Sequence, residues 1–137
     1  MGFFDLFGKK NVSEDISKKV PFSLNTEFVP YRLKSKEKNS CSMYIKLKNL
    51  TSEPVLGSIV VELPKQLSFD AMGLSREKEL RIGNIAANEQ KNQGIEIYGG
   101  LATDKGSYTL TITAFVHYRD YAHVINEMRK RAILEVI

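Results

Sequence analysis

Residues 107–118, SYTLTITAFVHY, alternate between two sets of side chains at every second position. One set consists of Tyr108, Leu110, Ile112, Ala114 and Val116, and the other of Thr109, Thr111, Thr113 and Phe115. Successive side chains of a strand point to opposite faces of its sheet, so this period predicts a β-strand with one face on a core. Threonine and aromatic residues, which are frequent here, also favour strands.

Further segments show the same period of two. In 43–50, MYIKLKNL, the side chains of Met43, Ile45 and Leu47 are expected to face inward, and those of Tyr44, Lys46 and Lys48 outward. The other segments with this pattern are 54–64, 78–85, 94–98 and 131–137. Turn-forming residues separate them, as in NLTSEP at 49–54.

Two segments leave alternatives open. Residues 21–33, PFSLNTEFVPYRL, fit a strand pair or a single strand interrupted by Pro30, and proline places either at a sheet edge because it lacks an N–H group. Residues 123–132, HVINEMRKRA, fit a helix or a strand, and the strand-like neighbours favour a strand.

Together these segments predict an all-β protein of about seven strands without helical crossovers, which is the pattern of an antiparallel β-sandwich. A chain of 137 residues is long enough for one such domain. We expect the domain to cover residues 20–137, with residues 1–19 forming an amphipathic arm and a polar linker.

The stretches MYIKLKNLTSEPVLGSIVVELP, LRIGNIAANEQ and GSYTLTITAFVHY resemble immunoglobulin-like domains of the CARDB and arrestin-like kind. The matching pieces are Leu47–Asn49, Ile85–Glu89 and Gly106–Tyr108, although IAANE lacks the usual Pro-Gly. A bare domain behind a short amphipathic N-terminus is also similar to small archaeal proteins. The resemblance implies binding, adhesion or scaffolding, with no catalytic residues to carry over.

Composition narrows the function classes. The net charge of +4 permits an anionic partner, and the single cysteine, Cys41, excludes an internal disulfide. We expect Cys41 to be half-buried and unreactive. No secretory signal, membrane span or nucleotide-binding or hydrolase motif is recognised, so we expect a cytoplasmic, non-enzymatic protein without a cofactor.

The chain opens with MGFFDLFGKK, in which Phe3, Phe4, Leu6 and Phe7 would cluster on one side of a helix, followed by Lys9 and Lys10. A helix this short needs a surface on which to form. Three surfaces are compatible with it. They are the anionic inner face of the membrane, a groove on a partner protein contacted by Phe3, Leu6 and Phe7, and the protein's own sandwich or that of a second copy.

Basic residues gather between positions 32 and 48, where only Glu37 offsets Arg32, Lys34, Lys36, Lys38, Lys46 and Lys48. A second group, 129–131, lies near the C-terminus. If both groups share one face they could bind nucleic-acid phosphates, with stacking on Tyr44. The alternative is an ordinary solvated strand face, on which lysines discourage aggregation.

A third hypothesis concerns HYRDYAH, in which His117, Asp120 and His123 are spaced three apart at the expected turn between the last two strands. Two imidazoles and a carboxylate could converge there as ligands for zinc or iron. The alternative is a polar hairpin tip.

The leading functional hypothesis is therefore an interaction or scaffold module, held at the inner membrane surface by its arm. Its partner is a protein not identified by the sequence, and self-association is compatible with it. A basic nucleic-acid-associated protein is the second hypothesis, and a metal-binding domain the third.

Overall fold

Eight β-strands make up the regular structure of residues 20–137, the part of the chain that the computed structural model describes. They are β1 (Phe22–Val29), β2 (Arg32–Leu33), β3 (Asn39–Asn49), β4 (Val55–Glu62), β5 (Glu77–Ile85), β6 (Gln90–Gly99), β7 (Gly106–His117) and β8 (Val124–Val136). This part of the chain has no helix that is long and apolar enough to cross a membrane.

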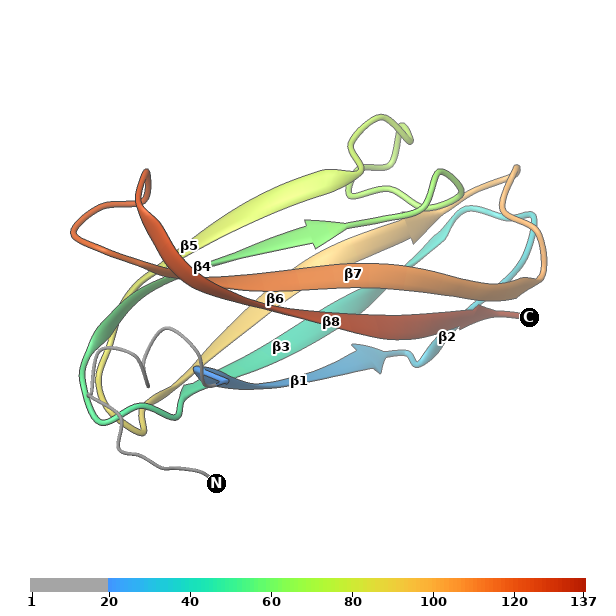
Figure 1. Ribbon diagram of the computed structural model, residues 1–137. Coiled ribbons are helices and arrows are strands. Elements are labelled where there is room, and N and C mark those ends of the chain that lie inside the picture. Colours follow the sequence, from blue (N-terminus) through green and yellow to red (C-terminus); the bar gives the residue numbers. More distant parts are fainter. Residues whose placement is uncertain (1–19) are drawn as a thin grey trace, which may run out of the picture.

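The strands form two facing sheets (Figure 1). One has three strands in the order β1-β3-β6, and the other has five in the order β2-β8-β7-β4-β5. All neighbouring strands are antiparallel except β2 and β8. The protein is therefore an all-β, immunoglobulin-like sandwich, as predicted.

The eighth strand arises where the chain changes sheets at Pro30. Before this residue, β1 pairs with β3 in the three-stranded sheet, and after it β2 pairs with Glu135 and Val136 of β8. Both β1 and β2 are edge strands, which confirms the position expected from the missing proline N–H. Segment 123–132, for which a helix was the alternative, is a strand that pairs with β7.

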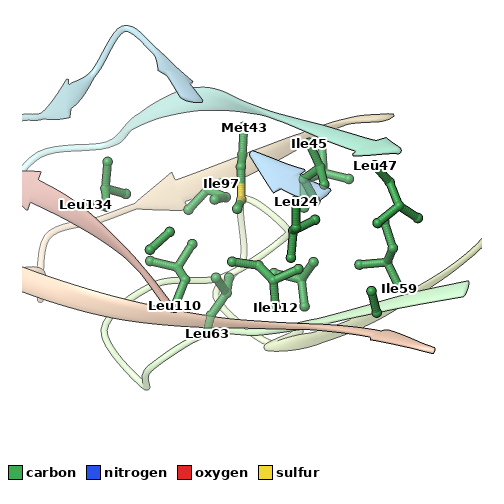
Figure 2. Packing of buried hydrophobic residues seen from close by; sticks show 14 of the residues in the cluster. Leu24, Met43, Ile45, Leu47, Ile59, Leu63, Ile97, Leu110, Ile112 and Leu134 are labelled. Carbon is green, nitrogen blue, oxygen red and sulfur yellow. The ribbon is translucent and has the colours of Figure 1, made fainter. Parts of the chain in front are cut away.

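The core consists of the inward-facing residues of both sheets, which interdigitate as Figure 2 shows for Met43, Leu110 and their neighbours. Met43, Ile45 and Leu47 of β3 are fully buried, whereas Tyr44, Lys46 and Lys48 are exposed, as the alternation predicts. Each large apolar side chain buried in this way contributes about 1.5–3 kcal/mol to the free energy of unfolding.

A lysine side chain connects the two sheets at one side of the sandwich. Strand β2 covers the outer edge of β8 at Glu135 and Val136 alone. Further along this edge, the Lys130 ammonium donates a hydrogen bond of 2.6 Å to the Leu24 carbonyl of β1. This side chain therefore joins the edges of the two sheets.

Asn49, at the end of β3, joins the turns at one end of the sandwich. Its fully buried amide nitrogen faces the carbonyl oxygens of Glu53, Ile85 and Ala86 at 2.8, 3.0 and 3.2 Å. Its side-chain oxygen accepts hydrogen bonds from the backbone N–H and the hydroxyl of Thr51. The connections β3–β4 and β5–β6, which both cross between sheets, are thereby held together.

Replacing Asn49 with aspartate keeps the side-chain shape but replaces the amide NH2 group, which donates hydrogen bonds, with a carboxylate oxygen. This oxygen would face the same three carbonyl oxygens and could not donate to them. We expect Asn49→Asp to lower the free energy of unfolding by about 2–4 kcal/mol, because a charge and several carbonyls lose their partners in the interior. Urea denaturation measures this change. Asn25→Asp, on the exposed face of β1, is the matched control and should change stability by less than about 0.5 kcal/mol. Equal losses in both variants would contradict the role of Asn49.

Candidate functional site

The predicted arm residues Phe3, Phe4, Leu6, Phe7, Lys9 and Lys10 lie outside the described residues, and their interpretation stays a prediction. The described chain starts at Val20 and enters β1 at Phe22, which pairs with Asn49. The arm therefore connects to the end of the sandwich that carries turns 50–54, 86–89 and 118–123. We call this the Asn49 end.

The structure separates the three residues of the predicted metal site. His117 is buried on the outer face of the five-stranded sheet, where its Nε2 atom lies 2.6 Å from the Ser58 hydroxyl. Asp120 and His123 instead pair with each other at 2.7 Å on the exposed hairpin. Residues 20–137 contain no group of three His, Cys, Asp or Glu side chains that could hold a metal ion, so the predicted ligand set is not assembled.

His117 belongs to a cluster of rings that the sequence analysis did not identify. The Tyr121 ring packs edge-on against it at 5.0 Å, and the Arg81 guanidinium lies 4.7 Å from the centre of the Tyr121 ring. Burial lowers the pKa of His117 below its usual value of 6.5. The alternation along β7 could have placed His117 correctly, since Val116 faces the core and the next residue therefore lies on the outer face.

The six basic residues between 32 and 48 do not form one surface. Arg32 lies on β2 and Lys34, Lys36 and Lys38 lie in the loop before β3, whereas Lys46 and Lys48 lie on the outer face of β3 near its other end. At a rise of about 3.3 Å per residue, Lys38 and Lys46 are about 27 Å apart along the strand. Arg129 and Arg131 lie on β8 in the other sheet. The nucleic-acid hypothesis needs these charges on one face, and the structure places them on separate surfaces.

Three loops meet at the opposite end of the sandwich, which we call the loop end: 34–38, 63–76 and 100–105 (Figure 1). They surround a pocket with a volume of about 550 Å³. Its lining includes the basic side chains of Lys38, Lys65 and Arg76 and the apolar side chains of Met72 and Leu101. Residues that are remote in the sequence thus surround one hollow.

Thr103 fixes the loops around this pocket. Its buried hydroxyl donates a hydrogen bond of 2.8 Å to the Gln66 carbonyl and accepts one of 2.9 Å from the Gly100 N–H. Its own carbonyl accepts a hydrogen bond of 2.8 Å from the Lys36 N–H. One residue therefore contacts all three loops.

The loop end also exposes apolar side chains. Met72, Leu74 and Leu101 are 82%, 73% and 70% exposed, the highest values among large hydrophobic residues of the described chain. They come from two different loops. Six Lys or Arg residues and three Asp or Glu residues occupy the three loops, so the surroundings of these side chains carry a net positive charge. Residues 63–76 and 100–105 have no periodic pattern, so the sequence alone does not reveal this site.

Cys41 is more deeply buried than expected, at 1% exposure. Burial raises the pKa of its thiol to about 11, and the neighbouring Glu96 charge adds to the increase. The thiol therefore stays protonated near neutral pH, in agreement with an unreactive side chain.

No family model and no curated protein matches the chain. Among solved structures, AvmM, which catalyses macrocyclization in alchivemycin A biosynthesis, matches with a TM-score of 0.52 at 7% identity, covering 85% of this chain and 88% of AvmM.

Two further matches are a CARDB domain and a PapD-like domain. The CARDB domain of the Pyrococcus furiosus PF1109 protein, solved with two metal ions, has a TM-score of 0.48 at 15% identity, covering 85% of this chain and 89% of that one. PapD-like domain 7 of human CEP192 has a TM-score of 0.44 at 13% identity, covering 100% and 96%. At such identities the likeness is one of fold alone, and the arrangement of the two sheets makes the chain an immunoglobulin-like β-sandwich.

The burial of His117 predicts a pH dependence of stability. The folded state disfavours the protonated ring, so the free energy of unfolding should decrease as the pH falls below about 6.5, until the lowered pKa is passed. Urea denaturation at pH values between about 7.5 and 5 measures this slope. His117→Gln, which keeps a hydrogen-bonding group next to Ser58, should remove part of this slope. An unchanged slope in His117→Gln would refute the assignment.

Thr103→Val should loosen the loop end without disturbing the core. Loss of the hydroxyl leaves the Gln66 carbonyl and the Gly100 N–H without a partner, which we expect to cost about 1–3 kcal/mol. Hydrogen exchange of the backbone N–H groups should accelerate at Gly100 and Lys36 but should not change in the central strands. Thr109→Val, at an exposed position of β7, is the control. Unaltered exchange at Gly100 would show that Thr103 does not organise these loops.

Proposed function

We propose that the protein is a non-enzymatic interaction module that its N-terminal arm holds at an anionic membrane surface, the inner face of the cell membrane. The observation that carries this proposal is the cluster of Phe3, Phe4, Leu6 and Phe7 directly before Lys9 and Lys10. Apolar side chains enter the boundary between headgroups and acyl chains, and lysines next to them contact anionic headgroups.

The expected strength of this attachment is low. Full burial of each large apolar side chain is worth about 1.5–3 kcal/mol, and each lysine near anionic lipid about 1 kcal/mol. Ordering the arm opposes these terms at about 1–2 kcal/mol per residue. The arm is therefore a reversible anchor that needs a second contact or a second copy for stable attachment.

The described domain supports a binding role over catalysis. The thiol of Cys41 and the hydroxyl of Ser58, which lies next to His117, belong to residues that are each 1% exposed, so a substrate could not reach them without rearrangement of the sandwich. The loops at both ends, in contrast, are exposed and held by hydrogen bonds. Binding surfaces in proteins are commonly carried by loops on a rigid scaffold.

Deletion of residues 1–10 tests the proposal. We expect the chain that starts at Asn11 to bind vesicles of phosphatidylcholine and phosphatidylserine at least about tenfold more weakly than the intact chain, because it lacks four apolar side chains and two lysines. Sedimentation with a range of lipid concentrations measures the partition coefficient.

Phe3→Ser/Phe7→Ser in the full chain is a companion variant that keeps both lysines and should lose a similar factor. Lys9→Gln/Lys10→Gln should lose less and should bind with a weaker salt dependence. Equal partitioning of the intact and the shortened chain would exclude the arm as a membrane anchor. The search would then move to a partner groove or a second copy of the chain.

A further inference from the structure

We propose that the loop end is a second membrane-contact site, at which Met72, Leu74 and Leu101 enter an anionic phospholipid bilayer while Lys38, Lys65 and Arg76 contact its headgroup phosphates. This inference does not depend on the arm, because it concerns the opposite end of the sandwich and different residues. It assigns a chemical class of ligand, the anionic phospholipid surface, to the pocket described above.

The apolar side chains project from fixed loops. The tip of loop 63–76 is closed by a hydrogen bond of 2.8 Å from the Phe69 N–H to the Ser75 carbonyl. Within it, the Asp70 carboxylate accepts a hydrogen bond of 2.8 Å from the Leu74 N–H. Gly73, between Met72 and Leu74, has a φ of +78°, which L side chains rarely adopt. The backbone thus holds both side chains outward, and Asp70 is turned into its own loop.

The basic side chains that line the pocket are available for an anionic ligand. The Arg76 Nε atom donates a hydrogen bond of 3.1 Å to the Lys65 carbonyl, which fixes the guanidinium at the pocket wall. Lys38, Lys65 and Arg76 form no ion pair with another described residue. Asp104, which also lines the pocket, is paired with Lys36 at 3.6 Å. The free charges at this hollow are therefore positive.

Protruding apolar tips beside cations fit a bilayer better than they fit a nucleic acid. Nucleic-acid phosphates would satisfy Lys38, Lys65 and Arg76 but would leave Met72 and Leu101 facing water. A bilayer takes up both kinds of side chain, because its headgroups contact the cations while its acyl region receives the tips. The two tip residues lie on different loops around one pocket, so they approach the same surface together.

The loop end and the arm can contact one membrane, although they lie at opposite ends of the sandwich. The twelve residues of β7 span about 40 Å. The twelve residues 8–19, between the apolar cluster of the arm and Val20, reach at most about 43 Å when extended, which is just enough for this span. Two weak contacts on one chain increase the overall affinity because the second forms at a high effective concentration.

Single-tryptophan variants of the full chain test the site directly, since the protein contains no tryptophan. Leu101→Trp reports on the loop end, and Leu50→Trp, at the Asn49 end, is the matched control because Leu50 is also exposed. With vesicles of phosphatidylcholine and phosphatidylserine, we expect a blue shift and protection from an aqueous quencher for Leu101→Trp alone. A shift at Leu50→Trp without one at Leu101→Trp would overturn the proposal.

Partition coefficients of full-chain variants provide the second measurement. Met72→Ser/Leu101→Ser should reduce binding to these vesicles by about tenfold or more, whereas Leu50→Ser/Val124→Ser should change it by less than about twofold. Lys38→Gln/Lys65→Gln should weaken binding and its salt dependence more than Lys46→Gln/Lys48→Gln, which removes two exposed charges from the face of β3.

All these positions are exposed, and unchanged circular dichroism and thermal unfolding would show that each variant is folded. Equal partitioning of the intact chain and the chain that starts at Asn11, with tryptophan insertion at position 101, would refute the arm and support the loop end. Equal partitioning of Met72→Ser/Leu101→Ser and its control would refute the loop end, and an acidic protein surface would become the next partner to examine.

Discussion

The carboxamide of Asn49 is enclosed at the point where the chain crosses twice between the sheets. It binds carbonyl oxygens of the β3–β4 connection and of the β5–β6 connection, so it fixes two turns that belong to different parts of the sequence. The position of the three-stranded sheet over the five-stranded one depends on these crossings. Four strands, β3, β4, β5 and β6, connect this point with the loop end. The positions of the loops at that end therefore depend on the turns that Asn49 holds.

Thr103 has a corresponding role at the far end, but with a different consequence. Asn49 uses its hydrogen bonds to close the interior, whereas Thr103 joins three loops whose outer side chains remain exposed. Because these hydrogen bonds hold the loops together, the side chains of Met72 and Leu101 are not needed for that purpose. They remain exposed on the surface, above the hydrogen bonds that fix the loops.

The sequence was sufficient for the strands and insufficient for the loops, and the reason is physical. Alternation along β3 and β7 identifies the buried residues because one face of each strand must meet the core, and Pro30 locates the edge because it lacks an N–H group. The loops at 63–76 and 100–105 follow no period, and hydrogen bonds between distant segments decide their shape.

The lysines between 34 and 48 are close in sequence, but a strand carries them to opposite ends of the molecule. His117 and His123 are likewise separated, since one lies on the sheet and the other on the hairpin.

Lys130 has a consequence for crowding on a two-dimensional surface. A protein that collects on a membrane reaches a high local concentration, and a free strand edge then becomes a template on which further copies can pair into fibres. The edge of β8 is long and is flanked by exposed isoleucines, Ile125 and Ile133. The Lys130 ammonium, which is hydrogen-bonded to the Leu24 carbonyl of β1, places a positive charge beside this edge, and a lysine at a strand edge discourages the pairing of another strand. The same side chain that joins the two sheets therefore also favours discrete molecules over polymers at high density.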